Sequence, residues 1–203
     1  PYTTLFRSGL ASYKGYFYVG FDLGNGKSKI IKYASTGRKI SETKIMKLGH
    51  CAEISYQNKT GLLYISNGGV TATHIYVVNY NLSKTVKEYN YGNLGNSALL
   101  AIDNVHNYMI LHTVTRGGDK GNPTVAIINL ANMSKVASFK IKNAGVPQGL
   151  ESDGRNIYLY TNNKTTVMDY KGKIASIYGV TQRGESEGIT IATVKGKGMM
   201  VVG

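Results

Sequence analysis

The sequence predicts an all-β fold, a β-propeller, and three observations carry that prediction. The 203 residues include 25 Gly and 16 Tyr but only three Pro and no Trp, a composition that favours strands and turns over helices. Short apolar and aromatic runs return at a nearly constant period along the chain. Each full period holds four such runs, which is the arrangement of a propeller blade. A β-sandwich also has many short strands, but it does not produce a period.

The repeat consists of four kinds of run in a fixed order. The most regular one begins at Tyr16, Leu62, Tyr108, Ile157 and Met199, and these starts lie 46, 46, 49 and 42 residues apart. A run that precedes it covers 9–12, 52–55, 97–100, 149–152 and 188–191. A third run covers 31–33, 78–80, 128–130 and 168–170, and a fourth begins at Lys39, Lys84, Lys135 and Lys173. Turns rich in Asn and Gly, such as 57–61 and 153–156, separate the runs as in β-hairpins.

These runs predict one propeller domain over residues 9–203, with five blades of four antiparallel strands. The blades are expected at 9–46, 50–91, 97–142, 148–178 and 187–203, the last one truncated. Since one sheet cannot bury both of its faces alone, the blades are expected to stack around an axis. We expect a monomer.

Residues 1–8 read as the translation of a common sequencing adapter, so we expect them to be an artefact outside the fold. The chain also stops at Gly203, directly after an apolar run. We therefore expect a gene fragment, with its true ends and any signal peptide lying outside it.

Several motifs with known chemistry are incomplete in this chain. The segment 24–28 has the Gly and Lys of a phosphate-binding loop, but the earlier Gly is absent and a strand pattern follows. The four His form neither an HxH nor an HExxH pair, and the single Cys excludes a Cys-rich zinc site. Cys51 adjoins His50, but neighbours in a strand point to opposite faces, which disfavours a nucleophile pair. No apolar run approaches the roughly 20 residues of a membrane span.

Polar residues gather at the starts of the runs expected to be innermost. They are His50 and Glu53, Gln148 and Glu151, and Glu185 and Glu187. Because the first strand of each blade lines the channel, we expect these side chains to converge at one channel mouth. Buried carboxylates without partners are costly, so they either cap backbone amides and pair with Arg183 or Arg155, or form a ligand or cation site.

The formal net charge of +13 is spread over turns and strand faces. Without an arginine-rich helix or a zinc finger, specific binding of nucleic acid is not expected. The charge indicates either a solvated surface or attraction to an anionic polymer such as teichoic acid, anionic lipid or acidic polysaccharide.

The order of the channel-side motifs resembles the helveticin J family, the large class III bacteriocins of lactic acid bacteria. The residues that carry the resemblance are 50–53 (HCAE), 148–149 (QG), 153–159 (DGRNIYL) and 185–189 (ESEGI), and it spans about residues 49–203. It implies a propeller-like domain in a secreted or cell-surface bacterial protein. The run 187–189 is also similar to inner strands of calcium-dependent lactonase-like and phytase-like propellers.

The sequence thus predicts a secreted propeller of the helveticin type that acts by binding rather than by turnover. Dispersed Lys would attract it to an anionic cell envelope, and the mouth formed by His50, Glu53, Gln148 and Glu187 would recognise a receptor or glycan. Two alternatives stay open. One is a calcium-dependent propeller hydrolase, as the second resemblance implies, in which Glu53 and Glu187 hold a Ca²⁺ ion in the channel. The other is a surface adhesin or scaffold without killing activity.

Overall fold

The computed structural model describes residues 6–116, 121–181, 186–194 and 196–203, and these form five antiparallel sheets. The first blade comprises β1 (Phe6–Tyr13), β2 (Tyr16–Asp22), β3 (Ser28–Ala34) and β4 (Lys39–Glu42). The second comprises β5 (Glu53–Gln57), β6 (Leu62–Ser66), β7 (His74–Asn79) and β8 (Lys84–Asn90). A 3-10 turn, η1 (Gly92–Leu94), leads to the third, with β9 (Asn96–Asp103), β10 (Tyr108–Val114), β11 (Pro123–Asn129) and β12 (Lys135–Lys140). The fourth comprises β13 (Pro147–Ser152), β14 (Ile157–Thr161), β15 (Lys164–Met168) and β16 (Ile174–Gly179), and β17 (Ile189–Val194) and β18 (Lys197–Val202) form the last sheet.

The described residues contain four complete blades, not the five that the sequence predicted. Residues 187–203 supply only an inner strand and its neighbour, β17 and β18, of six residues each. The strand pattern itself is confirmed, because every predicted run lies in or beside a strand in the expected order.

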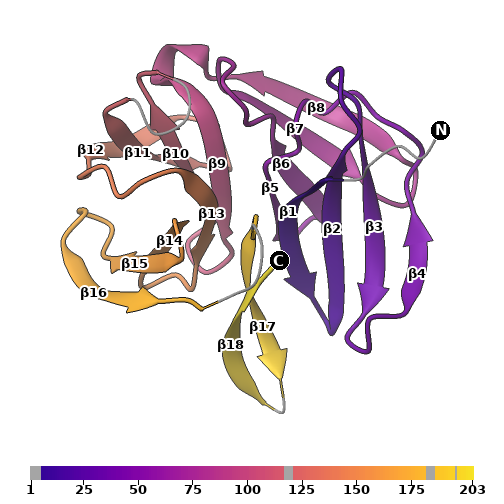
Figure 1. The fold of residues 1–203 in the computed structure, drawn as a ribbon. Helices are drawn as coiled ribbons and strands as arrows, with labels where there is room; N and C mark the ends of the chain where they lie inside the picture. Colours follow the sequence, from indigo (N-terminus) through magenta and orange to yellow (C-terminus); the bar gives the residue numbers. More distant parts are fainter. Residues whose placement is uncertain (1–5, 117–120, 182–185, 195) are drawn as a thin grey trace.

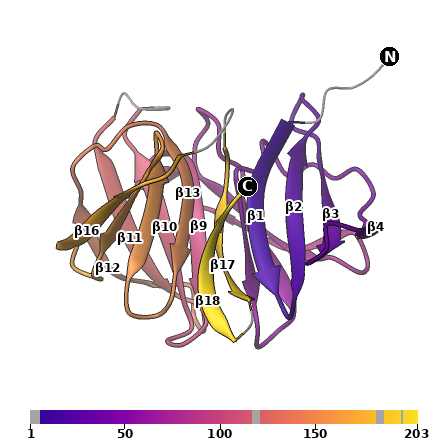
Figure 2. The same ribbon diagram turned by 60° about the horizontal axis from the view of Figure 1, so that its bottom comes forward.

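The first strand of each sheet is the innermost one. β1 contacts β5, β5 contacts β9, β9 contacts β13, β13 contacts β17, and β17 contacts β1. In the described part of the chain the inner strands therefore form a closed ring. Figures 1 and 2 show the blades arranged around it, with β17 and β18 beside β1. The outer strands β4, β8, β12 and β16 are largely exposed.

The fold begins before residue 9, where we expected it to start. Phe6 and Arg7 pair with Asp22 and Phe21 of β2, and Ser8 is buried. The end of β2 offers backbone hydrogen-bonding groups, and Phe6 and Arg7 pair with it. Of the segment assigned to the artefact, these three residues lie in β1, and residues 1–5 lie outside the described residues.

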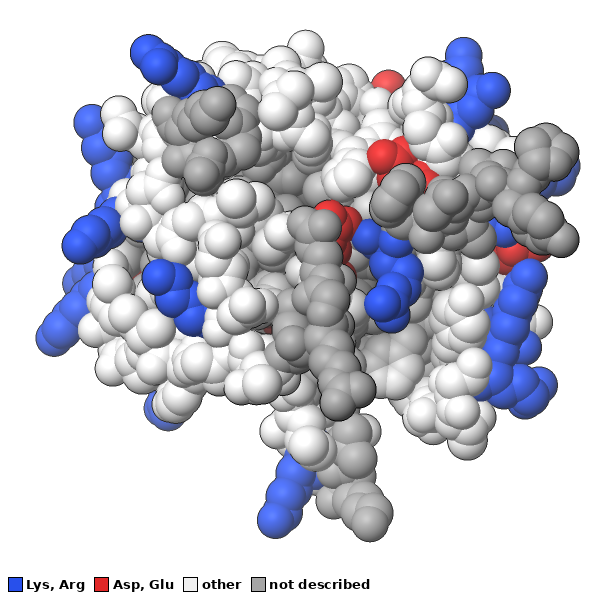
Figure 3. Space-filling model, viewed as in Figure 1, with Lys and Arg blue, Asp and Glu red and all other residues white. Residues whose placement is uncertain are grey.

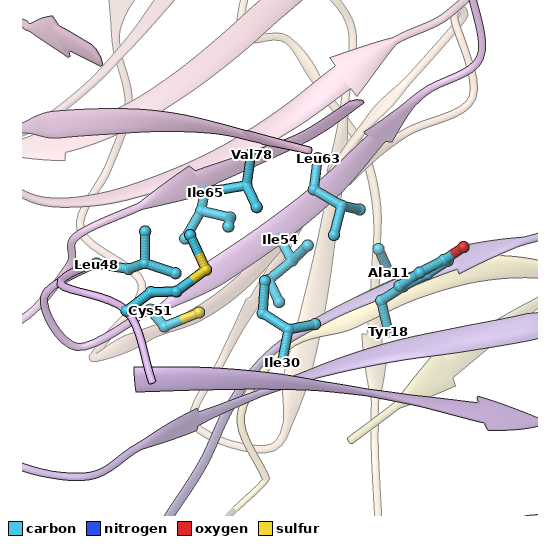
Figure 4. Packing of buried hydrophobic residues seen from close by; sticks show 10 residues of the cluster. Ala11, Tyr18, Ile30, Leu48, Cys51, Ile54, Leu63, Ile65 and Val78 are labelled. Atoms are coloured by element: carbon cyan, nitrogen blue, oxygen red, sulfur yellow. The ribbon is translucent and has the colours of Figure 1, made fainter. Parts of the chain in front are cut away.

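The core lies between neighbouring blades, where apolar side chains of facing sheets interlock. Between the first two blades, Ile30, Ile54 and Leu63 are almost completely enclosed (Figure 4). Cys51 is buried in the same cluster, and burial raises the pKa of its thiol. The thiol is therefore kept neutral and enclosed. His50 and Cys51 precede β5 rather than lie in it, so the prediction that they are neighbours within a strand was wrong.

The middle strands are buried on both faces for the same reason, and β10 shows the consequence for a polar residue. His112 on this strand is 2% exposed, and burial lowers the pKa of its imidazole to about 4.

No helix among the described residues has the length and hydrophobicity that crossing a membrane requires.

Candidate functional site

A cavity lies at each end of the ring of inner strands, whose axis we call the central channel. The narrow-mouth cavity, about 210 Å³, lies where the inner strands β5, β9, β13 and β17 begin, and includes His50, Ala52, Ser97, Gln148 and Glu187 in its lining. The wide-mouth cavity, about 600 Å³, lies toward the far ends of the inner strands. All five inner strands, β1, β5, β9, β13 and β17, contribute residues to its lining.

The structure divides the residues that the sequence predicted to meet at one mouth. His50, Gln148 and Glu187 line the narrow mouth together. Glu53 is buried inside the ring, and Glu151 lines the wide mouth. A strand rises about 3.3 Å per residue, so the three residues from Gln148 to Glu151 along β13 move a side chain roughly 10 Å down the channel. Arg183 and Glu185 lie outside the described residues.

At the narrow mouth, His50 lies between two carboxylates. Its Nδ1 is 2.7 Å from Oδ2 of Asp22, and its Nε2 is 3.8 Å from Oε2 of Glu187. Asp22 ends β2, and its Oδ1 accepts a hydrogen bond from the N–H of Gly24, which fixes the carboxylate at the turn. The sequence analysis did not identify Asp22 as a residue of this mouth. It could have done so, because Asp22 ends the second strand of its blade, on the side of the molecule where the inner strands begin.

Glu53 holds three inner strands together. Its Oε1 accepts hydrogen bonds from the N–H of Leu10 on β1 at 3.2 Å and of Ile54 at 3.3 Å. Its Oε2 accepts one from the N–H of Leu150 on β13 at 2.8 Å. Burial raises the pKa of this carboxyl well above its usual range, although the backbone donors oppose the shift. Capping of backbone amides, one of the two roles predicted for these carboxylates, is what Glu53 does.

The same contacts bear on the predicted calcium site at Glu53 and Glu187. Three of about four acceptor positions on the Glu53 carboxylate are taken by backbone N–H groups. Within the described ranges, no three His, Cys, Asp or Glu side chains come together in a group able to hold a metal ion. The geometry therefore favours a structural role for Glu53, and calcium binding stays a prediction for experiment.

The wide mouth carries functional candidates that sequence reasoning did not single out. The rings of Tyr13 and Tyr56 stack with centroids 3.9 Å apart and planes 14° from parallel. The two tyrosines occupy corresponding positions near the ends of β1 and β5. A comparison of the last residues of the predicted inner strands would therefore have identified them. Both line the cavity, together with Asn58 and Asn104.

Glu151 forms a polar network on the wall of the wide mouth. Its Oε2 accepts hydrogen bonds from Oγ1 of Thr190 at 3.1 Å and from the N–H of Ile191 at 3.3 Å, both on β17. Oγ1 of Thr190 accepts from the N–H of Ser12 on β1. Enclosure raises the pKa of Glu151 to about 7, against a usual 4.5, while the hydrogen bonds oppose the rise. Near neutral pH this carboxyl group can therefore both donate and accept a hydrogen bond.

The closed ring of inner strands and the blades around it define a β-propeller. Solved structures agree: the tail fibre of Staphylococcus aureus phage P68 is 20% identical with a TM-score of 0.64, and the match covers 93% of this chain and 44% of that one. The nidogen/laminin complex gives 13% identity and a TM-score of 0.57 over 91% and 84% of the two chains. The Dos1 propeller gives 13% and 0.54 over 98% and 54%.

At these identities the likeness shows the fold alone. This chain spans less than half of the tail-fibre chain that it matches. No family model matches the sequence, and no curated protein matches it.

Proposed function

We propose that this chain is a surface-binding propeller, secreted or displayed by a bacterium, which binds an anionic cell-envelope polymer or glycan as a helveticin-type protein would. The observation that carries the proposal is the central channel. Glu53 connects its inner strands from the inside, and side chains from separate blades line a cavity at each of its two mouths. Such concave sites on a rigid scaffold are suited to ligands. The likeness to a phage tail fibre supports a surface-binding role.

The charge distribution supports attraction to an anionic surface. The formal net charge is +13, and Figure 3 shows Lys and Arg side chains spread around the margin of one face. Spread charge of one sign attracts a polyanion over a distance of about one Debye length without fixing a geometry. Recognition would then fall to the narrow mouth, where His50, Gln148 and Glu187 meet.

The test is co-sedimentation of the chain with purified cell walls of lactic acid bacteria, before and after the anionic polymers are extracted. We expect saturable binding that falls when the polymers are removed. His50→Ala should weaken the saturable part without unfolding the protein, and Glu88→Gln, a change on the exposed strand β8, should not. Absence of saturable binding to walls of any kind would contradict the proposal.

Killing activity is tested separately, by growth inhibition of the bacteria whose walls are bound. Inhibition supports a bacteriocin, whereas wall binding without inhibition supports an adhesin or scaffold. Both outcomes keep the surface-binding role.

A further inference from the structure

We propose that the wide-mouth cavity is a binding site for a neutral saccharide, seated against Tyr13, whose ring is backed by Tyr56, and hydrogen-bonded by the polar side chains around it. This goes beyond the proposed function, which places recognition at the narrow mouth, because it assigns a ligand to the other end of the channel. The sugar-binding proposal rests on the proposed function only for the source of the sugar, which would be the cell envelope. Binding of a free sugar can be measured without cell walls.

The size and position of the cavity fit such a ligand. Its volume of about 600 Å³ falls in the range of small-molecule sites, which is roughly 300–1,000 Å³. Ala11, Ser55, Ile102, Glu151 and Thr190, one from each inner strand, take part in its lining. Because strands of all the blades hold the walls, the site is formed before a ligand arrives, and little ordering is needed on binding.

Tyr13 offers an aromatic surface, and Tyr56 backs it. Their rings stack on each other and remain partly exposed, and Tyr18 stacks on Tyr56 from within the core at 5.7 Å. This row of rings is held from behind and is therefore a rigid platform. The C–H face of a pyranose ring is apolar and packs on an aromatic ring, while the hydroxyl groups at its edge remain available for hydrogen bonds.

The wall beside the platform supplies hydroxyl, amide and carboxyl groups. Ser12, Glu151 and Thr190 are linked by hydrogen bonds across β1, β13 and β17, so their positions are fixed by three strands. Asn104 is fixed as well, because its Nδ2 donates to the carbonyl of Tyr56 and its Oδ1 accepts from the N–H of Asn58. Groups that donate and accept at set positions match the hydroxyl groups of a sugar.

The charges around the cavity favour a neutral sugar over an anionic one. Asp153 at the rim accepts hydrogen bonds from the N–H of Arg155 and Asn156 and from the Tyr158 hydroxyl, and these lower the pKa of its carboxyl. It is therefore a fixed negative charge. Among the described residues of the lining, Lys14 is the only basic one, and its Nζ lies 5.3 Å from the centroid of the Tyr13 ring. One cation beside Asp153 and Glu151 does not make an anion site.

The test is titration calorimetry and NMR of the chain with glucose, galactose, N-acetylglucosamine and their disaccharides, with glucuronic acid as the anionic probe. We expect at least one neutral sugar to bind with a dissociation constant of about 1 mM or tighter. Glucuronic acid should bind more weakly than glucose. Tyr13→Ala should weaken binding about tenfold, whereas Tyr178→Ala, which removes a tyrosine that is 60% exposed on β16, should not.

A second variant guards against unfolding. Thr193→Arg introduces a long side chain at an exposed residue of the cavity rim and should abolish binding with the melting temperature retained. The proposal is overturned if no sugar binds at about 20 mM, if the folded Tyr13→Ala and Thr193→Arg variants both bind normally, or if glucuronic acid binds best. Wall binding that persists without sugar binding overturns only this proposal; sugar binding without wall binding overturns only the proposed function.

Discussion

Glu53 shows how one buried side chain can hold a ring of strands together. Its carboxylate accepts backbone hydrogen bonds from β1 and β13 as well as from its own strand, so it joins three blades. No side-chain cation pairs with it among the contacts of the described residues. Its contribution to folding thus depends on satisfying backbone donors that would otherwise be buried without a partner.

Glu53→Ala should therefore lower the free energy of unfolding by at least about 3 kcal/mol, since it leaves the N–H groups of Leu10 and Leu150 unsatisfied. Urea denaturation followed by circular dichroism measures this. Glu88→Ala removes a carboxylate that is 56% exposed and should change stability by less than about 0.5 kcal/mol. Equal stability of the two variants would contradict the structural role of Glu53.

Glu151 should make stability depend on pH. The pKa of its carboxyl is raised from 4.5 to about 7 in the folded protein, so the folded state keeps a proton that the unfolded state loses between these values. Stability from this group is therefore present at low pH and falls as the pH rises from about 4.5 to about 7. His112 acts in the opposite direction, because its pKa is lowered to about 4.

A comparison of Glu151→Gln with the unaltered chain isolates the first effect, since His112 is common to both. The amide imitates the protonated acid, so the variant should gain stability relative to the parent between pH 5 and pH 8. Denaturation midpoints of both proteins at pH 5 and pH 8 measure this gain in stability. A constant difference between the two proteins would mean that Glu151 does not titrate in this range.

At the scale of the strand, glycines let the inner strands approach one another. A Cβ on Gly149 of β13 would lie 2.8 Å from the backbone N of Ile189, and one on Gly9 of β1 would lie 2.6 Å from the N of Ile54. Backbone cannot move aside as a flexible side chain can. The ring of inner strands therefore requires glycine at these places.

Gly149→Ala should accordingly cost about 1–3 kcal/mol, because β13 and β17 must move apart. Gly179→Ala on the outer strand β16 is the matched control: an added Cβ there meets nothing within 4 Å. The control should be neutral or slightly stabilising, since alanine restricts the unfolded chain. Thermal unfolding of both variants tests the difference. If Gly149→Ala leaves the melting temperature unchanged, the inner strands can move apart without loss of stability.

For the whole molecule, the net charge of +13 predicts that binding to cell walls depends on salt. Raising NaCl from about 50 to about 300 mM shortens the Debye length and should weaken wall binding severalfold. Binding of a neutral sugar at the wide mouth should change little over the same range. Sedimentation and calorimetry at both salt concentrations separate the two, and wall binding that ignores salt would exclude a role for the dispersed charge.

Calcium is also tested on the whole molecule. If Glu53 and Glu187 held Ca²⁺, an ion at 100 times its Kd would add about 2.7 kcal/mol of stability. Because backbone donors occupy most of the Glu53 carboxylate, we expect no shift in melting temperature between calcium and a chelator. A clear shift that Glu187→Gln abolishes would instead favour a metal-dependent propeller hydrolase.

The sequence by itself determined the blades, their strand order and the strand that lies innermost. These depend on local patterns: apolar runs of strand length, Asn and Gly turns, and a period that returns in every blade. It also placed His50, Gln148 and Glu187 at one mouth, because each stands at the start of an inner strand. The number of blades was overestimated, because the last sheet has only two strands among the described residues, and the start of β1 was placed too late.

Only the tertiary structure decided how the channel residues divide between its two ends. Glu53 lies inside, Glu151 lies at the wide mouth, and Tyr13 meets Tyr56 there, because a few residues of strand span much of the channel's length. Asp22 reaches His50 from a neighbouring blade for a similar reason. Such encounters depend on how the ring closes and on the depth at which each strand sits, and a repeat in the sequence fixes neither.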